Sequence, residues 1–191
     1  MAIQLSKGQR IDLTKNDPSL NSVGIGLGWD VKQFDGGHDF DLDASVFLLD
    51  ASGKCRHEQD LIFYNNLSSP DQSVIHAGDN RTGVGDGDDE KILVHLKKVS
   101  PEIQKIVVTV TIHDAGSRHQ NFGQVSNAYV RLSNEETDAE VLRYDLGEDF
   151  SIETAVVFCE LYRHNGDWKF AAIGSGYQGG LASLVSAYGL Q

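Results

Sequence analysis

The sequence predicts an all-β protein, a β-sandwich with a few short helices. Apolar residues alternate with polar or small residues in many short segments, and these segments are bounded by Gly, Asn, Asp or Ser. Helical periodicity is scarce, and many short strands with few helices are typical of two packed sheets. A sandwich of 191 residues can form one core, so we expect a single domain over residues 1–191.

The first strong strand signal covers residues 22–29, where bulky apolar side chains alternate with serine or glycine. One face of this strand is therefore bulky and the other nearly bare, so a neighbouring group should pack closely on the bare face. Asn165-Gly166 predicts a two-residue hairpin turn. The other expected strands are 45–49, 61–64, 92–96, 105–113, 128–133, 140–146, 155–163 and 168–173. The expected helical segments are single turns at 100–104 and 121–125 and a short amphipathic helix at 181–188.

The composition excludes several classes of protein. The formal net charge is −12 and the 16 Lys and Arg residues are scattered, which argues against a nucleic-acid backbone as partner. The first ten residues lack the apolar stretch of a signal peptide, and no apolar run is long enough for a bilayer, so we expect a soluble, cytoplasmic protein. Cys55 and Cys159 have no CxxC spacing, which favours free thiols in a reducing compartment.

Residues 79–90 place five carboxylates among three glycines. Carboxylates this close repel one another unless a cation lies among them, and glycine lets carbonyl and side-chain oxygens point at one centre. An all-oxygen shell suits a hard divalent ion, so calcium is the first hypothesis. The EF-hand template does not fit, because Ala44 occupies the required glycine position counted from Asp39, and flanking helices are not expected.

A second acidic segment supplies the rest of the proposed site. On a strand Asp39, Asp41 and Asp43 would share one side, and with the 86–90 loop they give seven carboxylates at one rim of the sandwich. A single divalent ion would leave most of that charge uncompensated, so two adjacent calcium ions are expected. A solvated acidic rim remains the alternative. The candidate metal ligands are Asp30, Asp39, Asp41, Asp43, Asn65, Asp79, Asn80, Gly85, Asp86, Asp88, Asp89 and Glu90.

Six segments spread along the chain carry a family resemblance. They are GLGWD at 26–30, DFDLDAS at 39–45, FYNNL at 63–67, GDNRTGVGDGDDE at 78–90, FGQV at 122–125 and ELYRH at 160–164. With them the chain resembles, along essentially its whole length, the TerD family of tellurium-resistance and stress proteins. The resemblance implies a calcium-binding β-sandwich, loosely like C2 domains, in a bacterial cytoplasm, with protein partners of the ter system, including partners at the inner membrane surface. Many family members carry Glu where this chain has Val84, which leaves only a backbone carbonyl there.

Other chemistry is weakly indicated. Gly24–Gly28 lacks the GxGxxG spacing of a dinucleotide site, and Ser175 is not in a GxSxG elbow. Cysteine attack on tellurite would need a thiolate, and Cys159 lies in an apolar segment. A zinc site would need the scattered histidines to meet. Those histidines are His76, His95, His113 and His119.

Three functions remain open from the sequence. The first is a non-enzymatic calcium-loaded module whose acidic rim docks a partner protein or an anionic surface. The second is a metal-dependent phosphoryl hydrolase in which two ions hold water and phosphate, with His38 or Arg81 nearby. The third is a plain calcium buffer, which differs from the first in needing no partner. An almost pure carboxylate ligand set favours a calcium cage over a catalytic centre.

Overall fold

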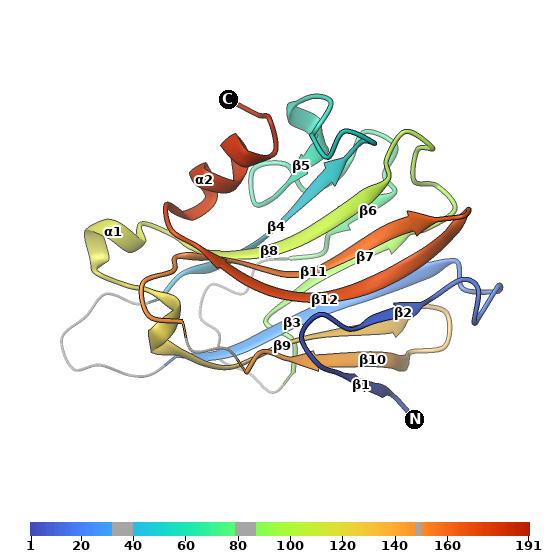
Figure 1. Ribbon diagram of the computed structural model, residues 1–191, viewed down its shortest axis with the longest axis horizontal. Coiled ribbons are helices and arrows are strands. Elements are labelled where there is room, and N and C mark those ends of the chain that lie inside the picture. The colour runs from blue at the N-terminus through green and yellow to red at the C-terminus, as the bar shows by residue number, and fades with distance from the viewer. Residues whose placement is uncertain (32–39, 79–86, 148–149) are drawn as a thin grey trace.

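The computed structural model describes residues 1–31, 40–78, 87–147 and 150–191 (Figure 1). In this part of the chain, two six-stranded sheets pack face to face and enclose the main apolar core. The first sheet has the order β1-β10-β9-β3-β7-β6 and the second β2-β12-β11-β8-β4-β5. Neighbouring strands are antiparallel, except that β1 runs parallel to β10.

Each sheet combines strands from the beginning, middle and end of the chain. We call them sheet A and sheet B. The strands of sheet A are β1 (Ile3–Leu5), β3 (Ser22–Val31), β6 (Val74–His76), β7 (Glu90–His95), β9 (Val125–Asn134) and β10 (Ala139–Asp145). The strands of sheet B are β2 (Arg10–Asp12), β4 (Leu42–Leu49), β5 (Leu61–Ile62), β8 (Lys105–Ile112), β11 (Ala155–His164) and β12 (Asp167–Tyr177).

The structure confirms the nearly all-β fold and every strand predicted from the sequence, with shifted ends. Asn165 and Gly166 have φ values of 51° and 84° and connect β11 to β12, as their turn chemistry predicts. The sequence reading missed the short edge strands β1, β2 and β6. Of the helical predictions, η2 (Phe122–Gln124) and α2 (Gly180–Ala187) are present, and 100–104 forms only a turn. The helices α1 (Ala115–Arg118) and η1 (Glu58–Asp60) were not predicted.

Strand β3 has the bulky face and the bare face that the sequence predicts. Val23, Ile25 and Leu27 are fully buried between the sheets. On the other face, a Cβ added to any of the three glycines would overlap a side chain, and for Gly26 that side chain is Asp88. The glycines at 24, 26 and 28 therefore admit side chains from neighbouring segments directly onto the backbone of β3.

Helix α2 covers the outer face of sheet B (Figure 1). Leu184 packs there with Phe47 and Leu49 of β4 and with Val107 of β8 in a second apolar cluster. Sheet B is consequently buried on both faces along β4 and β8, and every residue of β8 from Ile106 to Ile112 is buried.

Candidate functional site

Several predicted ligands gather at one end of the sandwich, which we call the acidic end. Strand β3 ends there at Val31, one residue after Asp30, β7 starts there with Glu90, and the register pairs Leu27 with Glu90. Strand β4 also starts at this end, because the carboxylate of Glu90 accepts a hydrogen bond from the Ala44 main chain. The end of β3, the start of β7 and the start of β4 therefore lie together at this end, although they are far apart in the sequence.

Asp89 is fixed to the backbone of β3 at the acidic end by two hydrogen bonds. Its backbone N–H donates to the carbonyl of Leu27 at 2.7 Å, and its Oδ2 accepts the backbone N–H of Trp29 at 2.8 Å. The residue is only 7% exposed. Burial raises the pKa of Asp89, and the negative charges of Asp30 and Asp88 raise it further. A cation beside Asp89 would stabilise its ionised form.

A hollow of about 310 Å³ opens next to this carboxylate. Asp30 and Asp89 line it, and Asp30 Oδ2 accepts a hydrogen bond from Asn127 Nδ2 at 2.7 Å. Tyr129 and Arg143 also line the hollow, and the Arg143 guanidinium carbon lies 3.9 Å from the Tyr129 ring centroid. The lining thus combines carboxylate and amide oxygens with a cation stacked on an aromatic ring.

Asp88 points away from this hollow, onto the bare face of β3. Arg131 Nε donates to its Oδ1 and Arg131 Nη2 to its Oδ2, both at 2.8 Å, and the Tyr129 hydroxyl donates to Oδ1 at 3.1 Å. This pairing uses both carboxylate oxygens. As a metal ligand Asp88 would have to share these oxygens with Arg131 or release it, and its assignment as a ligand stays a prediction.

Glu90 links the two sheets. Its side chain is fully buried and its Oε2 lies 2.8 Å from His76 Nε2 and 3.2 Å from the backbone nitrogen of Ala44. The first contact is within sheet A and the second crosses to β4 of sheet B. Glu90 therefore ties the sheets together at the acidic end, whatever else it binds.

The acidic segment before β4 is arranged differently from the expected row of three. Strand β4 begins at Leu42, and Asp41 precedes it with its carbonyl accepting the His113 N–H at 2.8 Å. Asp43 is 8% exposed and lies on the same face of β4 as Phe47, away from the face on which Ala44 joins the main core. Asp43 and Asp88 are therefore on opposite outer sides of the sandwich.

Asn65 is exposed in the turn that follows β5. Its neighbour Tyr64 lies with its ring centroid 6.4 Å from that of His113, which places this turn near the start of β4. The remaining predicted ligands lie outside the described residues. They are Asp39, Asp79, Asn80, Gly85 and Asp86.

The described ligands do not by themselves make a complete metal shell. Within residues 1–31, 40–78, 87–147 and 150–191, no group of three or more His, Cys, Asp or Glu side chains could hold a metal ion. Asp30 and Asp89 share one hollow, whereas the carboxylates of Asp43, Asp88 and Glu90 point to three other places. The four histidines considered for zinc are among these residues and do not form such a group either.

Sequence reasoning missed the partners of the acidic residues, namely Asn127, Tyr129, Arg131 and His76. A signal was available for two of them. Register places Arg131 opposite Gly26 and Tyr129 opposite Gly28 on neighbouring strands, so large side chains on β9 fill the space that the glycines leave. A Tyr-x-Arg pair on the outer face of a strand beside alternating glycines predicts such coverage.

The fold argues against two of the weaker hypotheses, a dinucleotide site and a reactive cysteine. Gly24–Gly28 lies within β3 and does not open a helix, so it is no phosphate loop. Cys55 and Cys159 are free and buried, as predicted, and burial raises the pKa of Cys55 to about 12. Burial also raises the pKa of Cys159, so neither thiol is an activated nucleophile.

Among the described helices, none has the length and apolar character needed to cross a membrane.

The fold and the acidic end define a two-sheet, all-β sandwich protein with a carboxylate-rich end. The family model described as TerD domain matches residues 1–188, and the chain belongs to the TerD family. Tellurium resistance protein TerD of Serratia marcescens is 58% identical over 190 residues, covering 100% of this chain and 98% of its own. General stress protein 16U of Bacillus subtilis is 63% identical over 191 residues, covering 100% and 99%.

A solved structure has the same fold. The crystal structure of a homologue of telluride resistance protein (TerD) from Streptomyces coelicolor A3(2) superimposes with a TM-score of 0.71 at 25% sequence identity. The match covers 87% of this chain and 95% of that one. The family resemblance and the β-sandwich expected from the sequence are thereby confirmed.

Proposed function

We propose that this protein is a calcium-binding cytoplasmic stress protein of the tellurite-resistance type, acting as an ion-dependent binding module rather than as an enzyme. The names of its relatives, a tellurium resistance protein and a general stress protein, support the biological role. The main observation in favour of a bound calcium ion is the buried Asp89 carboxylate, which lines a hollow of about 310 Å³ together with Asp30. The two carboxylates repel each other, and a bound cation would relieve this repulsion.

The donor set fits calcium. Asp30 and Asp89 offer hard carboxylate oxygens, and the acidic glycine-rich segment 79–86 joins the chain directly before Gly87, another residue of the hollow. We assign to the proposed ions the ligands predicted from the sequence, with Asp30 and Asp89 as the first pair. When bound, calcium would supply charge neutralisation and order, and no bond-making chemistry. Two adjacent ions remain our expectation from the number of carboxylates.

Ion binding would change the acidic end as a docking surface. Neutralising the carboxylates removes the repulsion that an anionic partner or membrane surface would meet, so partner affinity would differ between the two states. A plain calcium buffer would bind the ion with no such change in partner affinity. A phosphoryl hydrolase would release phosphate from an ester substrate in a metal-dependent manner.

Calorimetry with calcium and magnesium tests the proposal. Calcium should bind more tightly than magnesium, because flexible oxygen ligands satisfy a larger shell than a strict octahedron. Asp89→Asn and Asp41→Asn should weaken binding. The matched control is Glu102→Gln, a 74% exposed carboxylate outside the acidic end, and it should bind as the parent does. Millimolar affinity with an equal response to magnesium would remove the calcium assignment.

A second experiment separates the three functions. Lysate proteins retained on the immobilised protein with calcium and with chelator should differ, and the difference should vanish in Asp89→Asn. Identical recovery in all arms, with calorimetric binding intact, would favour the buffer. Metal-dependent hydrolysis of a phosphate ester, lost in Asp89→Asn and kept in Glu102→Gln, would favour the hydrolase.

A further inference from the structure

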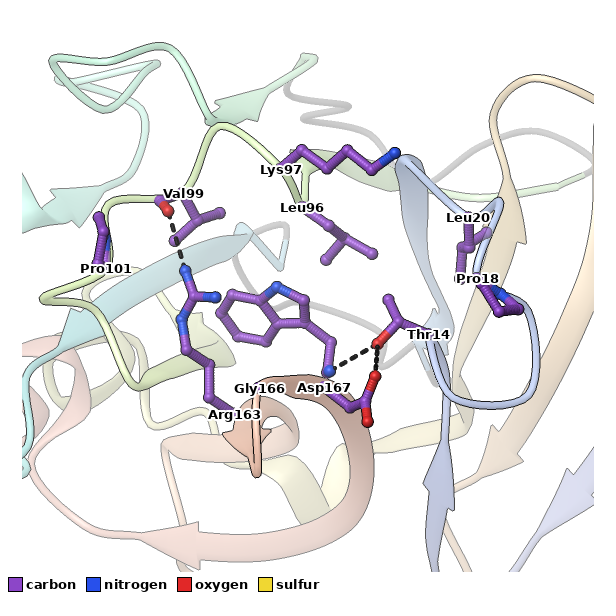
Figure 2. Close-up of a pocket in the computed structure, with 11 residues that line it drawn as sticks. Thr14, Pro18, Leu20, Leu96, Lys97, Val99, Pro101, Arg163, Gly166 and Asp167 are labelled. Carbon is purple, nitrogen blue, oxygen red and sulfur yellow. Dashed lines mark hydrogen bonds between the residues drawn. The ribbon is translucent and has the colours of Figure 1, made fainter.

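A second hollow lies at the opposite end of the sandwich, where the β11–β12 hairpin meets the segment between β2 and β3 (Figure 2). Its volume is about 410 Å³, within the range of roughly 300–1,000 Å³ typical of small-molecule sites. Leu20, Leu96 and Val99 are apolar, buried residues of its lining. Trp168 lines it too, and Pro18 and Pro101 complete the apolar part.

Arg163, the partly buried cation of this hollow, has main-chain carbonyls and an aromatic ring as partners. Arg163 donates from Nε to the Ile103 carbonyl at 2.9 Å and from Nη2 to the carbonyls of Val99 and Ser100. Its guanidinium carbon lies 4.3 Å from the ring centroid of Trp168. Burial lowers the pKa of Arg163, and among the described residues no carboxylate forms an ion pair with it.

Three other partly buried arginines in the described part of the chain are compensated by carboxylates. Arg56 pairs with Asp60, Arg131 with Asp88, and Arg143 with a carboxylate of its own strand. Arg163 instead meets only carbonyl oxygens and an aromatic ring, although the chain as a whole carries a charge of −12. A partly buried guanidinium without a carboxylate is a position where an anion would restore the charge balance.

The other polar groups of the hollow define a direction for a ligand. In Figure 2 Lys97 lies along the top of the hollow with its Nζ toward the Leu20 side, away from Arg163, and adds a second positive charge at an exposed position. On the side away from Arg163, Thr14 Oγ1 accepts a hydrogen bond from the backbone N–H of Trp168 at 2.9 Å and donates one to Asp167 Oδ1 at 3.1 Å. The hollow thus has Arg163 on one side, Thr14 and Asp167 on another, and Lys97 at its top.

We propose that this hollow binds a small organic anion, an acidic group carried on an apolar or aromatic body. The acidic group, a carboxylate or a phosphate monoester, binds at Arg163 Nη1, and the positive charge of Lys97 at the top of the hollow adds to the attraction. The body rests on the apolar lining, and a hydroxyl or amine on it donates to Asp167. The site is separate from the acidic end, so binding there does not depend on calcium.

Nuclear magnetic resonance of the tryptophan side chains tests this site, with phenyl phosphate and phenylacetate as probes and 2-phenylethanol as the neutral analogue. The indole N–H of Trp168 should shift with the anionic probes, while that of Trp29, at the acidic end, serves as the internal reference. Inorganic phosphate should bind more weakly than phenyl phosphate, because it lacks the body that contacts the apolar lining. A response to only one of the two anionic probes identifies which acidic group the site takes.

Two lysines provide matched variants. Lys97→Gln should weaken phenyl phosphate binding about two- to fivefold, as expected for an exposed charge, whereas Lys98→Gln, equally exposed but outside the hollow, should not. Arg163→Gln should weaken it more than about tenfold. Because Arg163 also holds the turn at 99–103, its variant is compared by melting temperature first, and if it unfolds, Lys97→Gln decides.

Three results would overturn the proposal. One is an unshifted Trp168 resonance at millimolar concentrations of both anions. Another is an equal response to 2-phenylethanol or equal affinity for inorganic phosphate and phenyl phosphate. The third is a Lys97→Gln variant that binds phenyl phosphate as the parent does.

Discussion

Gly26→Ala should destabilise the protein through one identifiable contact. The new Cβ would overlap the Asp88 carboxylate, which is held by two hydrogen bonds from Arg131 and one from Tyr129. Hydrogen bonds to charged groups contribute about 1.5–3 kcal/mol each. The Asp88 side chain is 11% exposed and that of Arg131 34%, so water compensates part of their loss. We expect about 2–4 kcal/mol, or a fall of roughly 4–16 °C in Tm for a chain of this size.

A double-mutant cycle measured by urea unfolding checks the cause. In an Asp88→Ala background the overlap is gone, so Gly26→Ala should change stability by less than about 1 kcal/mol. Gly116→Ala is the matched control, because a Cβ at that position meets nothing within 4 Å. Equal losses from Gly26→Ala in the two backgrounds would refute the argument that the glycine serves the Asp88 contact.

Three further outcomes follow from single features of the fold. Arg56→Ala should cost about 2–4 kcal/mol in urea unfolding, because it leaves the fully buried Asp60 carboxylate without its guanidinium, whereas Glu102→Ala on the exposed side of the same arginine should cost less than about 1. Gly166→Ala should cost about 1–2 kcal/mol, since its φ of 84° disfavours a side chain. Cys55, with a pKa raised by burial from 9.0 to about 12, should react with iodoacetamide at pH 9 far more slowly in the folded than in the unfolded protein. Stability from this thiol is fully present below about pH 9 and is lost as pH rises toward 12, so comparable labelling rates in both states would contradict its burial.

The strands were predictable because one face of a strand lies in the core and the other face in a different environment. Side-chain character therefore alternates every second residue. Strand β3 is the clearest example, since Val23, Ile25 and Leu27 alternate with glycines. The edge strands β1 and β2 were not predicted, because three residues are too few to show an alternating pattern. Their positions are set by pairing with β10 and β12, which is a long-range property.

The acidic end was only partly predictable. The sequence indicates the candidate carboxylates, including Asp30 and the 88–90 segment, but the antiparallel pairing of β3 with β7 that brings these two together is known only from the structure. It does not indicate which way each carboxylate points. Asp88 faces Arg131, Asp89 accepts a backbone N–H, and Glu90 reaches the other sheet, because the three belong to the irregular entry into β7. Such directions depend on partners from β3, β4 and β9.

The strand order of the two sheets has a consequence for synthesis of the protein. The central strand β3 is flanked by β9 and β7, and β4 by β8 and β5, so residues made early wait for residues made much later. Strands β1 and β2 pair only with β10 and β12, close to the end of the chain. Neither sheet can be completed while the ribosome still holds the last third of the sequence. Folding should therefore be slow and largely post-translational, with apolar strand edges exposed to chaperones or aggregation in the meantime.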